Sequence, residues 1–112
     1  MLTRVGARAY ARRMPYRFDA ELWTMNDGRW HMLTVPEKDS DEIDQRTTGL
    51  QGGFGSVKVE VTIGTSTWTT SVFPSQQQGA YVLPVKKAVR TAQGCAAGDT
   101  VTVGLKLVGL ET

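Results

Sequence analysis

The stretch from residue 81 to residue 108 constrains the fold most, because it reads as a strand, a helix and a second strand in direct succession. After the apolar strand end at 81–83, Pro84 has the fixed φ that suits the first position of a helix. Gly94 is expected to end that helix, and an alternating strand over 101–107 follows. The helix should bury the apolar residues that share one face, namely Val85, Ala88, Val89 and Ala92.

An earlier part of the chain shows the same succession in a weaker form. Alternating strands are predicted from Tyr16 and from Trp30, with a hairpin turn at 26–28 between them. Asp39 and Glu42 have the spacing of a capping box, which predicts a short helix to about residue 46, anchored by Ile43. Further strands are expected at 57–63 and at 67–73.

The two halves share a pattern, which predicts an internal repeat. A shift of 44 residues maps 57–63 onto 101–107, and a shift of 48 maps 33–36 onto 81–84. Each half would leave exposed strand edges by itself. We therefore expect a mainly β fold with two short helices: two β-β-α-β repeats forming a six-stranded closed, double-split β-barrel, with helices capping its ends. Because the halves pair within one chain, the protein is expected to be a monomer.

Length and composition indicate one small domain. The 112 residues divide into a basic N-terminal arm, residues 1–15, and a single β-barrel domain, residues 16–112. The single cysteine fits a reducing cytoplasm, and no apolar run is long enough to span a membrane. The arm holds four bases and no acid, so the rest of the chain is mildly acidic; these bases are Arg4, Arg8, Arg12 and Arg13.

The arm admits three interpretations. It is a solvated or partly ordered terminus, an organelle transit peptide, or a basic stripe for phosphate or an acidic partner. Arg4, Arg8 and Arg12 have the i, i+4 spacing that a helical stripe needs. Met14 is also a plausible start site, in which case the arm is not part of the native product.

An ordered set of short motifs resembles the bacterial domain of unknown function 1905, over Tyr16 to about Leu110. The motifs are Phe18-x-Ala20, Trp30 with Val35-Pro36, Gly64 before a hairpin, Gly79-x-Tyr81-x-Leu83-Pro84-x-Lys86-Lys87-Ala88-x-Arg90, and Gly98-Asp99-x-Val101. The resemblance implies a double-split β-barrel like that of the AbrB and MazE transcription regulators, whose half-barrels dimerise. It implies no activity, because the family has none established, although relatives are sometimes joined to a domain associated with bacteriocin resistance. The loop Gly49–Gly55 is longer and richer in glycine than the family leads us to expect.

The residues that usually carry catalysis are not arranged for it. His31 is the only histidine and lacks metal partners at a known spacing, and Cys95 follows a helix C-terminus, where the dipole raises a thiol pKa. The glycine loop lacks the Lys-Ser/Thr of a P-loop, and the acidic run from Asp39 to Asp44 lacks the EF-hand pattern. We therefore predict no catalytic residue, no metal, no cofactor and no enzyme activity.

Binding is the expected function, by a non-catalytic module for an unknown small molecule or protein partner. The alternative is nucleic-acid binding, by analogy with AbrB-like barrels, through the arm and the helix bases; the mildly acidic body disfavours it. The same side chains also have plainer interpretations, as core or rim packing for the tryptophans and exposed surface for the bases. The candidate binding residues are Trp30, Trp68, Lys86, Lys87 and Arg90.

Overall fold

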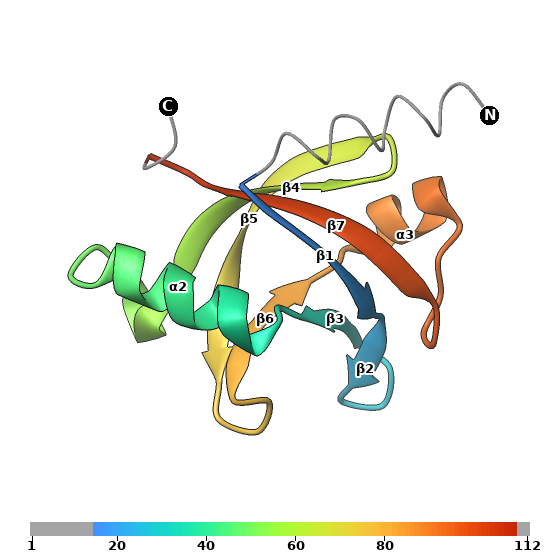
Figure 1. The fold of residues 1–112 in the computed structure, drawn as a ribbon. Coiled ribbons are helices and arrows are strands. Elements are labelled where there is room, and N and C mark those ends of the chain that lie inside the picture. The colour runs from blue at the N-terminus through green and yellow to red at the C-terminus, as the bar shows by residue number, and fades with distance from the viewer. Residues whose placement is uncertain (1–14, 110–112) are drawn as a thin grey trace.

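The protein forms one curled antiparallel sheet of seven strands with two α-helices (Figure 1). The computed structural model describes residues 15–109, so the predicted basic arm lies outside the described residues apart from Pro15. The strand order is β1-β7-β4-β5-β6-β3-β2. The elements are β1 (Tyr16–Glu21), β2 (Trp23–Met25), β3 (Trp30–Thr34), α2 (Glu37–Thr47), the 3₁₀ turn η1 (Gly53–Gly55), β4 (Val57–Ile63), β5 (Ser66–Ser75), β6 (Ala80–Pro84), α3 (Lys87–Gln93) and β7 (Thr100–Leu107).

The predicted mainly β class and the two helices are confirmed, but the closed six-stranded barrel is wrong. The first predicted strand bends at Leu22 and becomes two strands, β1 paired with β7 and β2 paired with β3. Leu22 is buried, and its backbone is bonded to the turn before β7, through Leu22 N–H to Asp99 O and Gly98 N–H to Leu22 O, both at 2.8 Å. The bend directs β1 and β2 to opposite ends of the sheet order, so the sheet is a curled half-barrel with two terminal strands.

The internal repeat is visible in the strand register. β4 pairs with β7, and the central pair of that ladder joins Val61 to Leu105, two residues related by the predicted shift of 44. In the other ladder the shift is 50 rather than the predicted 48, because β3 and β6 begin at residues 30 and 80 and the helices at 37 and 87. Val35 N–H bonds to Tyr81 O, and Val85 N–H bonds to His31 O, both at 2.9 Å. These two bonds exchange under a shift of 50, as a pseudo-two-fold axis requires.

The change of six, from 50 to 44, has two sources. The second helix has seven residues where the first has eleven, and seven residues (94–100) lie between it and Val101, where nine (48–56) lie between the first helix and Val57. The predicted place of Pro84 at the start of this helix is wrong. Pro84 ends β6 opposite Met32, and Lys86 is the N-cap residue. Gly94 does end the helix, with φ +63°, which glycine adopts without steric cost.

The helices lie at opposite ends of the curled sheet (Figure 1) and each places one apolar side chain in the core, Ile43 from α2 and Val89 from α3. Ala88 and Ala92 are exposed, so the predicted four-residue apolar face is wrong at these positions. The start of α2 was also predicted too late, because the helix begins at Glu37, without a side-chain cap.

Candidate functional site

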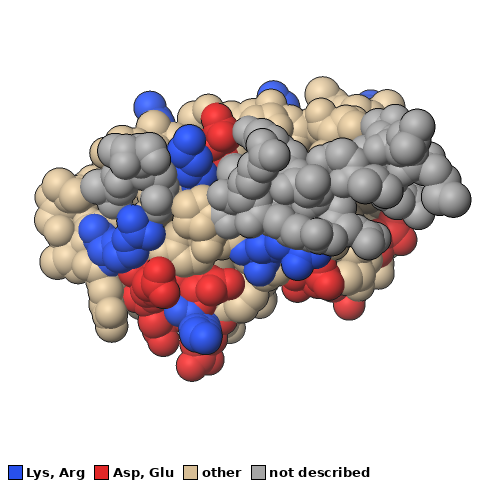
Figure 2. Space-filling model, turned by 45° about the horizontal axis from the view of Figure 1, so that its top comes forward, with Lys and Arg blue, Asp and Glu red and all other residues tan. Residues whose placement is uncertain are grey.

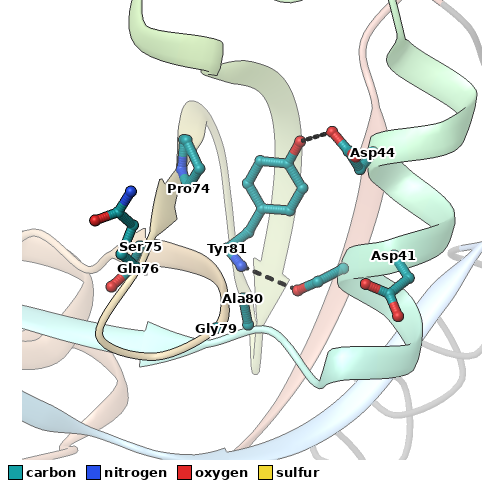
Figure 3. A pocket seen from close by; sticks show the side chains of 9 residues that line it. Asp41, Asp44, Pro74, Ser75, Gln76, Gly79, Ala80 and Tyr81 are labelled. Atoms are coloured by element: carbon teal, nitrogen blue, oxygen red, sulfur yellow. Dashed lines mark hydrogen bonds between the residues drawn. The ribbon is translucent and has the colours of Figure 1, made fainter.

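A pocket lies between α2 and the hairpin that joins β5 to β6 (Figure 3). Its volume is about 460 Å³. The helix contributes two carboxylates and a hydroxyl to its wall, while the hairpin contributes Pro74, a tyrosine ring and short side chains. The lining residues are Ser40, Asp41, Asp44, Pro74, Ser75, Gln76, Gly79, Ala80 and Tyr81. We call this the α2–hairpin pocket.

Hydrogen bonds from α2 to β6 hold the shape of the pocket (Figure 3). Ser40 Oγ donates to Val35 O at 3.0 Å and accepts from Tyr81 N–H at 3.0 Å. The Tyr81 hydroxyl donates to Asp44 Oδ1 at 3.2 Å, and Gln51 Nε2 donates to the same oxygen at 2.9 Å. The helix is therefore tied to β6 at two points of Tyr81, its backbone N–H and its hydroxyl.

The pocket is electronegative. Its lining includes two carboxylates and no Lys or Arg. Burial, followed by the charge of Asp44, raises the pKa of Tyr81 above its usual 10.0, so the phenol stays protonated at neutral pH. Asp41 is exposed, and within residues 15–109 its carboxylate makes no hydrogen bond or ion pair. The pocket thus presents two carboxylates and no side-chain cation.

The pseudo-equivalent corner of the second half contains His31 and Arg90. Arg90 Nε donates to Val85 O at 3.2 Å, and Arg90 Nη1 lies 3.4 Å from His31 Nε2. Burial, and then the charge of Arg90, lower the pKa of His31 below 6.5, so the ring is neutral at pH 7. Because Arg90 donates to Nε2, the proton of the neutral ring belongs on Nδ1, which is buried and has no partner among the described atoms.

The five predicted binding residues are dispersed, and none lines the α2–hairpin pocket. Trp68 packs partly buried against the core, as its plainer interpretation anticipated. Lys86 and Lys87 are exposed at the start of α3, while Arg90 is half-buried against His31. On the face drawn in Figure 2, Lys and Arg alternate with Asp and Glu instead of forming one basic surface.

Trp30 belongs to a second feature, an apolar surface on the outside of the sheet. The register places Trp23 and Pro84 on either side of Met32, and Phe73 beside Val82. Met32 and Val82 are buried, yet neither belongs to the core cluster inside the curled sheet. We call this surface the outer face, and it consists of Trp23, Met25, Trp30, Met32, Phe73, Val82 and Pro84.

The outer face is open to solvent at two of its aromatic side chains. Trp30 is 53% exposed and Phe73 is 40% exposed. The buried apolar residues of the helices, Ile43 and Val89, pack into the core on the other side of the sheet. Trp23 Nε1 donates to Thr34 Oγ1 at 2.9 Å, which ties the indole of Trp23 to β3. The strands β3 and β6 therefore carry apolar side chains on both faces, with Leu33, Tyr81 and Leu83 on the core side.

The glycine loop has a defined shape. Gly52 N–H bonds to Ser56 O at 2.9 Å and Ser56 N–H bonds back to Gly53 O at 3.2 Å. These bonds close a tight turn with Phe54 at its tip, at φ +59° and 98% exposed. A second pocket of about 400 Å³ lies beside this loop, and Leu50 forms part of its wall.

Among the described residues, no group of three or more His, Cys, Asp or Glu side chains is placed to hold a metal ion. Burial raises the pKa of Cys95, so its thiol is protonated at neutral pH. The direction agrees with the prediction, which gave the helix dipole as the cause. Within residues 15–109, no helix has the length and apolar character that crossing a membrane requires.

The fold and these two surfaces define a two-repeat, curled antiparallel β domain. The chain belongs to the family described as Domain of unknown function (DUF1905), whose model matches residues 18–105. The resemblance drawn from the sequence motifs is thereby confirmed over most of the chain. None of the curated proteins compared with it matches this chain.

Proposed function

We propose that the protein is a non-catalytic interaction module and that the outer face is the surface with which it binds a protein partner. The observation that supports this is the apolar character of β3 and β6 on both sides of the sheet, extended on the outer side by Trp23 and Met25 of β2 and Phe73 of β5. An antiparallel sheet at a protein surface usually has one apolar and one polar face. A second apolar face that is left open to water is typical of an interaction site.

The composition of the outer face also favours a protein partner. Tryptophan, phenylalanine and methionine are enriched at protein interfaces, and tryptophan is among the side chains whose removal costs most binding energy. Trp30 and Phe73 are exposed enough to contact a partner directly. Met32 and Val82 are buried on the same face, Val82 directly beside Phe73. The thiol of Cys95, the only cysteine, supports a reducing compartment such as the cytoplasm.

Nucleic-acid binding gains less support from the described residues. Arg90 is engaged with Val85 O and His31, which leaves Lys86 and Lys87 as the exposed bases of α3. Two lysines neutralise few phosphates, whereas sequence-independent binding usually relies on several. The arm bases Arg4, Arg8, Arg12 and Arg13 lie outside the described residues.

The test is selection of peptides from a random display library on the immobilised protein. Peptides rich in apolar residues should be enriched, and their affinity should fall about tenfold or more for a Trp30→Ser, Phe73→Ser variant, as expected for interface anchors. The matched control is Leu50→Ser with Phe54→Ser, which removes two apolar side chains that are 66% and 98% exposed in the glycine loop. An equal loss of peptide affinity in the two double variants, or an affinity that neither of them changes, would contradict the proposal.

A further inference from the structure

The two halves of the chain place different residues at one equivalent position of the fold. Under the shift of 50, Ser40 corresponds to Arg90, and Val35 corresponds to Val85. The correspondence extends to hydrogen bonding, because Ser40 Oγ donates to Val35 O at 3.0 Å and Arg90 Nε donates to Val85 O at 3.2 Å. The carbonyl at this equivalent position thus accepts a hydrogen bond from a short hydroxyl in the first half and from a guanidinium in the second.

The space beyond that carbonyl is filled differently. In the second half, the Arg90 guanidinium extends to the ring of His31, which corresponds to Tyr81. In the first half, Ser40 is too short to reach so far, and the α2–hairpin pocket of about 460 Å³ lies beside it. The short side chain therefore leaves a pocket where the other half carries its own cation.

The corner that lacks an arginine carries negative charge, and the corner that has Arg90 does not carry it at the equivalent positions. Asp41 and Asp44 line the α2–hairpin pocket. The corresponding residues on the other helix are Thr91 and Gly94, which carry no charge. The corner without a cation of its own therefore has two carboxylates, and the corner with Arg90 has none at these positions.

We infer that the α2–hairpin pocket binds a guanidinium or ammonium group supplied from outside the chain, in the place that Arg90 fills in the other half. The cation would be held by the carboxylates of Asp41 and Asp44, with Pro74 and the edge of Tyr81 against its apolar stem. This site is separate from the outer face, so it does not depend on the proposed function.

The test is titration of the ¹⁵N-labelled protein with agmatine, with butylamine and with the uncharged N-butylacetamide, followed by NMR. Saturable shifts for the two cations should be confined to the amides of residues 40–44 and 79–81, with none from the neutral amide. A blocked Gly-Arg-Gly peptide distinguishes the sources of the cation. Tighter binding of the peptide than of agmatine assigns the site to an arginine side chain of a partner, and the reverse order assigns it to a free small cation.

Matched charge variants separate a specific site from general attraction. Asp41→Asn should weaken binding about fivefold, as expected for loss of one partly exposed ion pair. Asp27→Asn removes the same charge from the β2–β3 turn, where φ is +57° and asparagine is readily accommodated, and it should leave the affinity unchanged. Equal weakening in the two variants, shifts spread over the acidic surface, or no saturable shift at low salt would overturn the inference.

Discussion

Ser40 and Tyr81 are joined by a hydrogen bond of 3.0 Å from the Tyr81 backbone N–H to the Ser40 hydroxyl oxygen. The bond connects the helix of the first half to a strand of the second, across 41 residues of sequence. Because the same hydroxyl donates to Val35 O, one buried side chain pairs with two backbone groups, the N–H of Tyr81 in β6 and the carbonyl of Val35 just after β3. The pocket beside it depends on this link.

We predict that Ser40→Ala lowers the free energy of unfolding by about 1–3 kcal/mol, since it leaves a buried N–H and a buried carbonyl unpaired. Urea denaturation measures the change. The control is Ser75→Ala, because Ser75 Oγ only accepts the exposed Gln78 N–H at 3.2 Å; its effect should stay within roughly 0.5 kcal/mol. Equal stability of the two variants would mean that the Ser40 bonds add nothing to the fold.

Gly64 and Gly79 provide a test of close packing at a turn. Both have positive φ, +59° and +64°, so alanine strains either backbone. At Gly64 an added Cβ would also collide with the side-chain amide of Gln93, whereas at Gly79 nothing lies within 4 Å. Gln93 Nε2 bonds to Thr65 and Ser66 at 3.0 and 2.8 Å, so it cannot move without losing these bonds.

Gly64→Ala should therefore lower the melting temperature more than Gly79→Ala. The strain common to both is about 1–2 kcal/mol, and the difference between the variants reports the contact with Gln93. In a Gln93→Ala background the two glycine variants should become equally stable. A difference that survives in that background would show that the side-chain amide is not its cause.

The strands could be predicted from the sequence because their alternation is strong, but the half-barrel could not. No residue around Leu22 indicates a bend, because the alternation continues from Glu21 to Trp23 without glycine or proline. The strand is interrupted by backbone hydrogen bonds from Leu22 to Gly98 and Asp99, which are distant in the sequence. Pro84 led to a wrong prediction of the helix start. A proline that follows an apolar run is compatible both with the end of a strand and with the first position of a helix, and the sequence does not distinguish the two.

The outer face leaves a signal in the sequence, whereas the α2–hairpin pocket does not. Apolar residues at adjacent positions, Met32 with Leu33 and Val82 with Leu83, are typical of strands buried on both faces, and this signal predicts the outer face. The α2–hairpin pocket has no comparable signal. It exists because Ser40 is short where Arg90 is long, and that correspondence requires the shift of 50, which the structure supplies.

His31 should make the protein less stable in acid. Its pKa in the folded state is lowered, by burial first and by Arg90 second, from an ordinary value of 6.5. A histidine held neutral by the fold binds its proton more readily when unfolded, so its contribution to stability is complete above about pH 6.5 and is lost as the pH falls through the lowered pKa.

An NMR titration of the single histidine should accordingly give a midpoint below 6.5. Arg90→Gln removes the neighbouring positive charge and should raise that midpoint, while Lys106→Gln, an equal change of charge on β7, should not. The melting temperature of the wild type should fall more steeply from pH 7 to pH 5 than that of His31→Gln. A midpoint at or above 6.5 would show that the corner does not disfavour the charged ring.

The pseudo-two-fold axis leads to a last prediction, that the 12.3 kDa chain is a monomer. β4 pairs with β7 and β3 with β6 inside one chain, with Val61 opposite Leu105 at the centre of the first ladder. These ladders supply, inside one chain, the pairing between halves that a protein with only one of the two repeats would obtain from a second subunit. Light scattering during size exclusion should give the monomer mass across a hundredfold range of concentration. A dimer that persists at the lowest concentration would contradict this, whereas weak association removed by Trp30→Ser would place a second copy on the outer face.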